Sequence, residues 1–408
     1  KINYKKLHPL KILIITQYFY PENFRINDLV FSLKKKGYDV EVLTGKPNYP
    51  IGTYYKGYSW DSRSFEVINE VSVHRTNLFL RGKGGGLRLI INYISFIFFG
   101  FFRLSKLKGH FDKVFIYAPS PITVGLLGII AAKKFKCKSY LWIHDLWPES
   151  VKIAGGVNNK LILGIVDWMT RFIYAKTDIL LIQSPFFKKY LEKQKVDLNK
   201  VIYYPYYAED FYKPVIPSNK IVTQFPKGFN LLFAGNIGNA QSFDTIVGAI
   251  NLIKERDINV IILGDGRDKE RIKTKIESLK LSHKFYFLGT HASELMPEYF
   301  AAANALLITL KKAEIFSYTI PGKLQSYLAC GKPIIGALDG IGKQIIEDSN
   351  CGLSADADDI IGLSENIIKM NKMSSKELVT FGKNGLDYFN NHFNKEKLLN
   401  DFQVILKG

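Results

Sequence analysis

The sequence contains little cysteine. Its 408 residues include three cysteines, Cys137, Cys330 and Cys351, which lie far apart and form no Cys-x-x-Cys pair. This pattern argues against a disulfide framework and against a zinc site, and it is typical of a reducing compartment. The basic start, residues 1–10, leads straight into a strand-like run without the apolar segment of a secretory signal peptide. We therefore expect a cytoplasmic protein that holds no metal ion.

Acidic residues are scarce relative to basic ones. The chain has 37 Asp and Glu against 56 Lys and Arg, which gives a formal net charge of +19. Such a balance predicts a polyanionic partner, either nucleic acid, an anionic membrane surface or a phosphorylated substrate. A general bias of composition toward lysine is the alternative. The sequence has no basic stripe with interleaved stacking aromatics on a recognised nucleic-acid module, so we expect no nucleic-acid partner.

Long apolar runs are missing, with one exception at residues 87–102. Arg88 and Asn92 interrupt this run, and its uninterrupted part is shorter than the roughly 20 residues that a membrane span needs. Basic residues flank it, among them Arg81 before it and Arg103 after it. Phenylalanines occur on every side of the expected helix, which favours a helix that lies in the membrane interface. A buried core helix is the alternative.

Short, continuous apolar runs that alternate with helical stretches are abundant. Such runs are typical of strands covered on both faces, and their alternation with helices predicts parallel sheets with crossover helices. One series of runs lies before residue 205 and a second series follows residue 229. The runs are 11–16, 40–43, 114–117, 139–143 and 179–183, and then 230–234, 259–263, 285–288, 305–308 and 333–336.

The two series of strands divide the chain into two α/β domains. A stretch rich in tyrosine and proline, from about 203 to 217, is interpreted as a linker. We predict a Rossmann-like domain at 1–207, with the membrane-interface segment at about 87–108 inside it, and a second Rossmann-like domain at 208–390. An amphipathic helix within 391–408 ends the chain and could cross back to the first domain.

Ligands of open α/β sheets bind beyond the carboxyl ends of the strands, so the residues after each strand are the candidate site residues. In the first domain, His144, Asp145 and Glu149 follow the strand at 139–143. A histidine and carboxylates in this place suit acid–base chemistry or contacts to a substrate hydroxyl, although a lone histidine is more often structural. Arg25, near a helix start after the first strand, could bind an anion, and a structural ion pair is the alternative.

Two glycine turns follow the first two strands of the second domain. Glycine allows backbone N–H groups to approach a phosphate, and the helix that follows supplies a positive end. Each turn taken alone is equally consistent with an ordinary connection between a strand and a helix. The residues concerned are Gly235 and Asn236 in the first turn, and Gly264, Gly266 and Arg267 in the second.

The most informative stretch of the sequence runs from 314 to 336. It contains a carboxylate at Glu314, a turn at Pro321 and Gly322, and Lys323 at the start of a helix. A helix start that carries a lysine can neutralise a departing diphosphate without a metal ion. The candidate catalytic residues are therefore His144, Glu314 and Lys323.

Together these motifs resemble the GT-B glycosyltransferases of the large retaining family 4 over nearly the whole chain. The matching pieces include HDLWPES at 144–150, FAGNIG at 233–238, ILGDG at 262–266 and the block from Pro321 to Gly336. The likeness is greatest to bacterial enzymes that build O-antigen, capsule or exopolysaccharide, including those of the N-acetyl-L-fucosamine transferase type. The resemblance implies the GT-B fold, in which two Rossmann-like domains face each other across a cleft.

The resemblance also implies an activity. It implies transfer, with retention of anomeric configuration, of a sugar from a nucleotide-sugar donor that is a UDP-linked N-acetylated hexosamine or deoxyhexosamine. The acceptor would be a polyprenyl-diphosphate-linked saccharide, and the reaction would need no cofactor and no metal ion. The basic surface and the apolar segment then predict a peripheral enzyme on the inner face of the cell membrane. A nucleotide-sugar 2-epimerase of the same architecture is the alternative.

The chain departs from the family pattern at three positions. Asn236 and Gln241 stand where many members have an arginine and a lysine that hold the donor diphosphate, and Ser326 stands where many have a second glutamate. The resemblance therefore assigns the diphosphate mainly to Lys323 and the neighbouring backbone amides. The residues expected at the donor are Gly235, Asn236, Gly264, Gly266, Arg267, Pro321, Gly322, Leu324 and Ser326, and those expected at the acceptor are Arg25, Asp145 and Glu149.

A literal Asp-x-Asp triplet occurs at Asp356-Ala357-Asp358. In GT-A enzymes such a triplet binds a metal ion. Here it lies late in the chain, in a polar loop, so we expect a solvated surface segment.

Overall fold

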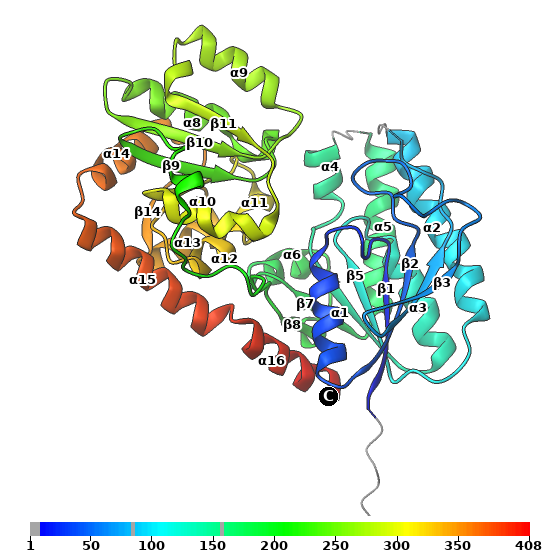
Figure 1. Cartoon of the computed structure of the whole chain (residues 1–408). Coiled ribbons are helices and arrows are strands. Elements are labelled where there is room, and N and C mark those ends of the chain that lie inside the picture. Colours follow the sequence, from blue (N-terminus) through cyan, green and yellow to red (C-terminus); the bar gives the residue numbers. More distant parts are fainter. Residues whose placement is uncertain (1–8, 83–85, 156–158) are drawn as a thin grey trace, which may run out of the picture. The chain divides into compact units, whose positions relative to one another are not determined.

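The computed structural model describes residues 9–82, 86–155 and 159–408, which form two compact units (Figure 1). The first unit holds the described residues up to Tyr204 together with Leu399–Gly408, and the second holds Pro205–Leu398. The division lies close to the boundary at 207 that the sequence predicts. The last helix, α16 (Lys395–Lys407), begins among the residues of the second unit and continues into those of the first.

Within the described residues, the first unit is built on an eight-stranded sheet that is parallel except at one edge. The central strands are buried along almost their whole length, as expected where helices cover both faces. The edge strand β3 is antiparallel to β4 and partly exposed. In spatial order the strands are β3 (Phe65–Ile68), β4 (Val71–Thr76), β2 (Asp39–Gly45), β1 (Lys11–Thr16), β5 (Lys113–Ala118), β6 (Lys138–Ile143), β7 (Ile179–Ile182) and β8 (Val201–Tyr203).

Three helices of the first unit lie side by side in one layer on the sheet. Gly100 of α2 lies against Leu127 of α3, and Gly125 of α3 lies against Ile173 of α5. The missing side chains of the two glycines allow this close approach. The helices of the first unit are α1 (Arg25–Lys35), α2 (Gly86–Lys106), α3 (Val124–Phe135), α4 (Glu149–Gly155), α5 (Lys160–Lys176) and α6 (Phe187–Lys193).

The apolar segment that the sequence predicts at the membrane interface is α2. By length and composition it is the one helix among the described residues that could cross a membrane. One of its faces is nevertheless packed into the first unit: Asn92 and Phe96 are fully buried, and the Gln17 side chain donates a 2.8 Å hydrogen bond to the Asn92 amide oxygen. The inner face of α2 therefore belongs to the core and its outer face is exposed, and the location at a membrane interface stays a prediction.

The second unit has a six-stranded parallel sheet with helices on both faces. Its core contains the apolar strand residues and the inner faces of α8 and α14. The strands, in spatial order, are β11 (Phe285–Gly289), β10 (Ile258–Leu263), β9 (Phe229–Ala234), β12 (Ala305–Thr309), β13 (Ile334–Ala337) and β14 (Gly352–Ala355). The helices are α7 (Asn219–Val222), α8 (Phe243–Leu252), α9 (Lys269–Ser278), α10 (Met296–Ala302), α11 (Glu314–Tyr318), α12 (Gly322–Ala329), α13 (Gly340–Asp348), α14 (Ile360–Asn371) and α15 (Ser375–His392).

In each sheet, successive strands are added first on one side and then on the other side of a single strand, which is β1 in the first unit and β9 in the second. β1 pairs with β2 on one side and with β5 on the other. β9 likewise pairs with β10 and with β12. Loops that leave the carboxyl ends of such neighbours run in opposite directions and leave a crevice, which is where open α/β sheets bind their ligands. The loops that follow these strands therefore hold the candidate site residues of each unit.

The contact between α3 and α5 yields a testable prediction. A Cβ atom at Gly125 would lie 2.5 Å from the Ile173 side chain, so we expect Gly125→Ala to destabilise the first unit by about 1–3 kcal/mol. Gly164→Ala on α5 is the matched control, because nothing lies within 4 Å of its Cβ position and helix propensity predicts a gain of roughly 0.5–1 kcal/mol. Urea unfolding measures both variants, and equal shifts would contradict the close packing.

Candidate functional site

In the first unit, Glu22 joins the loop after β1 to the loop after β2. Its side chain is fully buried, and its carboxylate accepts backbone N–H hydrogen bonds from Asn48 (2.8 Å), Tyr49 (2.7 Å) and Phe19 (3.2 Å). Burial raises the pKa of Glu22 to about 7, although the three hydrogen bonds act in the opposite direction. Glu22 was not predicted as a site residue, because nothing in the order of residues shows that the two loops meet.

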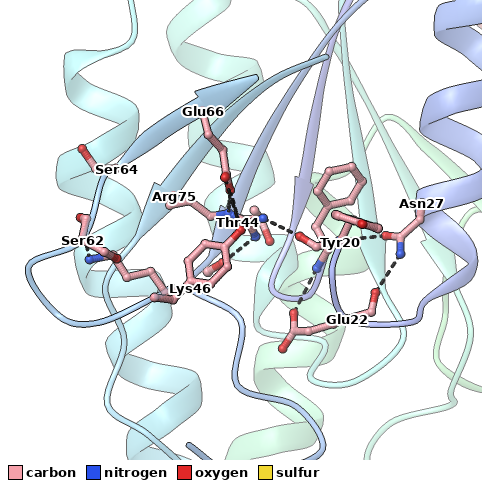
Figure 2. Close-up of polar contacts among 12 residues, drawn as sticks. Tyr20, Glu22, Asn27, Thr44, Lys46, Ser62, Ser64, Glu66 and Arg75 are labelled. Atoms are coloured by element: carbon pink, nitrogen blue, oxygen red, sulfur yellow. Dashed lines mark hydrogen bonds and ion pairs between the residues drawn. The ribbon is translucent and has the colours of Figure 1, made fainter. Parts of the chain in front are cut away.

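A buried arginine and a buried lysine hold the segments around Glu22 (Figure 2). Arg75 of β4 donates to the Glu66 carboxylate (2.7 Å), to the Gly45 carbonyl (3.1 Å) and to the carbonyl of Tyr20. The Lys46 ammonium donates to the carbonyls of Ser59 (2.7 Å) and Ser62 (3.0 Å) and to that of Trp60. Both cations are engaged by the protein itself, so they stabilise the loops.

Asn27 of α1 completes this framework. It accepts the Tyr20 N–H at 3.0 Å and donates to the Glu22 carbonyl at 2.7 Å, as Figure 2 shows. The start of α1 is thereby fixed against the loop after β1. Arg25, a predicted acceptor residue, is the first residue of this helix.

His144 lies at the carboxyl end of β6, as the sequence predicts, and it is buried. Its ring packs edge-on against Tyr117, with centroids 4.4 Å apart, and against Trp142 at 4.7 Å. Burial lowers the pKa of His144 well below 6.5, and the positive charge of Arg25 acts in the same direction. The structure thus brings these two predicted residues within electrostatic reach, and it keeps the imidazole neutral at pH 7.

The other two predicted acceptor residues follow His144. Asp145 has an exposed side chain. Glu149, the first residue of α4, accepts a 2.5 Å hydrogen bond from the Tyr190 hydroxyl, which also lies 2.7 Å from the Trp147 carbonyl. Glu149 therefore has a partner on α6, and its role toward an acceptor stays a prediction.

An aromatic cluster at the same edge of the sheet was not predicted. The rings of Tyr18 and Phe24 are stacked with centroids 4.9 Å apart, and the Tyr49 ring lies 5.4 Å and 5.2 Å from them. The Arg81 guanidinium lies 5.0 Å from the centre of the Tyr49 ring. Aromatic faces beside a cation are typical of binding sites for amphiphilic ligands. The sequence indicates only the aromatic loop after β1, because Tyr49 and Arg81 come from distant segments.

In the second unit, the predicted glycine turns after β9 and β10 interlock. Gly264 has φ +137°, and a Cβ atom there would lie 1.9 Å from the Gly235 carbonyl oxygen. A Cβ atom at Gly266 would lie 2.1 Å from the carbonyl oxygen of Ile237, whose N–H donates to the Asp265 carbonyl at 2.8 Å. The second turn therefore needs glycine so that it can pack against the first, a reason that the sequence alone does not reveal.

Lys323 lies beside the first of these turns. Its ammonium is 2.6 Å from the Gln241 amide oxygen and 3.7 Å from the centre of the Phe233 ring, and it would touch a side chain placed at Gly235. Burial lowers the pKa of Lys323 to about 7. The structure thus unites the end of β9, the start of α12 and one cation, an arrangement that suits an anionic phosphate group.

The start of α12 differs in detail from the predicted diphosphate site. The Leu324 N–H donates to the Pro321 carbonyl at 2.8 Å, and the Leu324 side chain is fully buried. This amide is therefore used in the first turn of the helix. Ser326 is also buried in α12, and the neighbouring Tyr327 hydroxyl accepts the Ala234 N–H at 3.0 Å, which ties the helix to β9.

Three further predicted site residues, the catalytic candidate Glu314 and the donor-site candidates Asn236 and Arg267, lie at the surface of the second unit. Glu314 begins α11 with an exposed side chain, and the Tyr318 hydroxyl donates to its carboxylate. Asn236 and Arg267 are exposed in the turns after β9 and β10. These positions are compatible with ligand contact, and the roles of the three residues stay predictions.

The two carboxylates of the Asp-x-Asp triplet are exposed, as expected of a solvated surface segment. Asp356 pairs with Lys343 at 2.6 Å. Asp358 also accepts the Lys312 N–H at 2.9 Å and the hydroxyl of Ser242, so it ties the loop after β12 to the start of α8. In the part of the chain that the structure describes, no group of three or more His, Cys, Asp or Glu side chains is placed to hold a metal ion.

Comparison with known sequences gives the class of the second unit. Residues 217–387 match the family described as "Glycosyl transferases group 1". The "Probable glycosyltransferase WbjE" of Pseudomonas aeruginosa is 24% identical over 237 residues, which are 56% of this chain and 59% of that protein. The "Putative colanic acid biosynthesis glycosyl transferase WcaI" of Escherichia coli is 22% identical over 346 residues, which are 79% of this chain and 82% of that protein.

Solved structures are similar to the whole chain. Sucrose-phosphate synthase of Thermosynechococcus elongatus has a TM-score of 0.76 at 16% identity, with 98% of both chains covered. HepE of Anabaena in complex with UDP has a TM-score of 0.70 at 12% identity, with 98% of this chain and 100% of that one covered. The predicted fold, GT-B with two Rossmann-like units, is confirmed. Residues 217–387 match the group 1 glycosyltransferase family, which supports glycosyltransferase as the enzyme class. The finer likeness to N-acetyl-L-fucosamine transferases stays a prediction.

The buried carboxyl group of Glu22 predicts a pH dependence of stability. Its pKa is about 7 in the folded chain and near 4.5 in the unfolded chain, so the native state binds more protons between these values and stability falls as pH rises through this window. The difference corresponds to roughly 3 kcal/mol. We expect Glu22→Gln to lack this fall in urea unfolding between pH 4.5 and 8. Glu192→Gln, at an exposed position, should retain it, and an unchanged slope in Glu22→Gln would contradict the assignment.

The lowered pKa of Lys323, about 7, predicts a pH dependence of donor binding. Only the protonated amine attracts a diphosphate, so we expect the affinity for UDP-glucose, used as the probe, to weaken about tenfold between pH 6.5 and 8.5. Lys323→Arg should bind with a nearly flat profile, because a guanidinium stays protonated. Lys254→Met, at an exposed position of the second unit, should follow the wild type. Calorimetric titration tests this, and a wild-type profile in Lys323→Arg would refute it.

Proposed function

We propose that this protein is a retaining glycosyltransferase of bacterial surface polysaccharide biosynthesis. It would move a sugar from a UDP-linked N-acetylated hexosamine or deoxyhexosamine to a polyprenyl-diphosphate-linked saccharide. The match of residues 217–387 to group 1 glycosyltransferases supports sugar transfer, and the names of the relatives, one of them a putative colanic acid biosynthesis enzyme, support the pathway class. The UDP complex of HepE supports a uridine nucleotide as the carrier.

The observation that carries the proposal is the position of Lys323. Its ammonium lies next to Gly235, where the backbone turns at the end of β9, and at the start of α12. A diphosphate that leaves a sugar develops negative charge, and a cation fixed in place beforehand stabilises that charge in the transition state. The amide oxygen of Gln241 keeps the ammonium at 2.6 Å without neutralising it. The chain thus compensates in part for the Arg and Lys that the family pattern has elsewhere.

We assign the acceptor to the carboxyl edge of the first unit. The neutral imidazole of His144 can exchange a hydrogen bond with an acceptor hydroxyl, and the positive charge of Arg25 opposes its protonation. Asp145 and Glu149 extend the same edge with carboxylates that suit sugar hydroxyls. Tyr49 and Arg81 add an aromatic face and a second cation, which fit a saccharide linked to a diphosphate.

We also propose that the protein works as a peripheral enzyme on the cytoplasmic face of the membrane. Its net charge of +19 and the exposed apolar face of α2 support this location. A lipid-linked acceptor remains in the bilayer, so an enzyme at the surface meets it without extracting the lipid.

A direct test measures UDP release with and without the lipid-linked acceptor. Release only with acceptor supports transfer, and nuclear magnetic resonance of the product reports whether the anomeric configuration is retained. A nucleotide-sugar 2-epimerase, the second candidate, would convert the donor without any acceptor. Conversion of the donor alone would therefore overturn the proposal in favour of the epimerase.

The candidate catalytic residues give a further prediction. We expect His144→Ala and Glu314→Gln each to lower kcat by roughly 10²-fold or more. His144→Ala should bind UDP-glucose as the wild type does, because the donor is assigned to the second unit. Glu365→Gln, at an exposed position of α14, is the control and should keep full activity. Full activity of His144→Ala in the UDP-release assay would remove His144 from the mechanism.

A further inference from the structure

α2 has the opposite polarity from a helix on the surface of an ordinary globular protein. Its exposed stripe is apolar for more than four turns, and Leu87 (72% exposed), Ile94 (60%) and Phe98 (56%) are its most exposed members. The stripe consists of Leu87, Ile90, Ile91, Ile94, Phe98, Phe101 and Phe102. Its polar residues Asn92 and Ser95 are buried on the inner face. Apolar stripes of this length are kept in water only where something else covers them.

α5 carries a second stripe of the same kind, which the sequence analysis did not identify. Leu161 (74% exposed), Ile165 (57%), Trp168 (69%) and Phe172 (39%) are spaced at i, i+4, i+7 and i+11, so they line one side of the helix. The opposite side, with Ile173 and Tyr174, is buried in the unit. The stripe is therefore an outer surface of a well-packed helix.

The two stripes belong to one layer of the fold (Figure 1). α3 lies between the two helices, against α2 at Gly100 and against α5 at Gly125. α3 itself exposes an apolar side chain, Ile130. We call the stripes of α2 and α5, together with Ile130, the two-helix apolar surface.

Basic residues far outnumber acidic ones on the three helices of this layer. α2 and α3 contain no acidic residue, and the single acidic residue of α5, Asp167, is paired with Arg171 at 2.8 Å. The basic residues of the three helices are Arg88, Arg103, Lys106, Lys133, Lys134, Lys160, Arg171 and Lys176. An apolar centre with basic residues around it complements an anionic lipid bilayer, in which acyl chains lie beneath negative head groups.

We propose that the two-helix apolar surface docks the first unit onto an anionic bilayer, with α5 as a second anchor beside α2. The inference rests on the membrane location in the proposed function, and it adds the second element of contact. α2 does not cross the bilayer, because Asn92 is bonded to Gln17 and Phe96 is buried in the unit. Two helices in one layer fix an orientation as well as an affinity, whereas one helix lying in the interface allows rotation about its axis.

The orientation has a consequence for the acceptor. Gln17 leads into the loop after β1, and its bond to Asn92 links that loop to α2. A bilayer that covers the outer face of α2 therefore lies across this helix from Gln17, the residue before Tyr18 of the aromatic cluster. A diphosphate at the membrane surface would reach this edge while its lipid stays in the bilayer.

The test uses the full chain and sedimentation with vesicles of phosphatidylglycerol and phosphatidylcholine, with pure phosphatidylcholine for comparison. We expect wild-type protein to bind the anionic vesicles, and Ile165→Glu/Trp168→Glu to bind at least tenfold more weakly. Val379→Glu and Val404→Glu, at equally exposed apolar positions outside the surface, are the controls and should bind as wild type does. Wild-type binding by the α5 double variant would overturn the proposal.

A second measurement keeps the test independent of folding. Brominated lipids quench tryptophan only on contact, so anionic vesicles that contain them should quench the wild type and should quench Trp168→Phe much less. Equal quenching of both proteins would overturn the role of α5. If the α5 double variant instead turns a lipid-free dimer into a monomer and leaves vesicle binding unchanged, the surface joins two copies of the chain and the proposal is wrong.

Failure of the docking surface can be distinguished from failure of the proposed sugar transfer. Sugar transfer to a short-chain, water-soluble acceptor needs no bilayer, so the α5 double variant should retain wild-type turnover there. A chain that binds vesicles through α5 but transfers no sugar would refute the proposed function alone. A chain that transfers sugar but does not bind anionic vesicles would refute the docking surface alone.

Discussion

Parallel strands must be joined by crossover segments, and this constraint decides where the candidate residues of both units lie. Every loop that leaves a strand emerges at the same edge of its sheet, so residues far apart in sequence meet there. In the first unit this edge unites Glu22, Tyr49 and His144. In the second unit it unites Gly235, Gly264 and Lys323 through the strands β9 and β10 and the helix α12. The chemistry of each unit depends on this single geometric fact.

Burial at these edges moves three titratable groups toward their neutral forms. The pKa of Glu22 is raised to about 7, that of Lys323 is lowered to about 7, and that of His144 is lowered well below 6.5. In each case desolvation is the largest cause, and for Glu22 it outweighs the opposing backbone hydrogen bonds and the charge of Arg75. Glu22 is held by backbone N–H groups and links two loops. Lys323 and His144 lie at the sheet edges where ligands of such folds bind, and perturbed groups in such places mark candidate binding sites.

Much of the fold follows from local patterns, whereas the packing between segments does not. Continuous apolar runs and the turns between them predict the parallel strands, the two units and the places of His144 and Lys323. The interlocked glycine turns, the link from Glu22 to Asn48 and the cation of Arg81 over Tyr49 depend on loops that meet only in three dimensions. The bonds of the exposed Asp358 to Ser242 and Lys312 are unpredictable for the same reason, because these partners lie far from it in sequence.

α2 shows how a buried polar contact decides which face of a helix is exposed. A sequence with apolar residues on all sides of a helix does not reveal which side faces the core, and here the core side is the one with Asn92 and Ser95. Burying an amide is favourable only if its hydrogen bonds are satisfied, and Gln17 and the Phe79 carbonyl satisfy them at 2.8 and 2.6 Å. These bonds fix the rotation of the helix and leave Leu87, Ile94 and Phe98 on its outward face. An outward apolar face is therefore specified by a buried polar contact, and that contact also fixes the helix to the loop at which we place the acceptor.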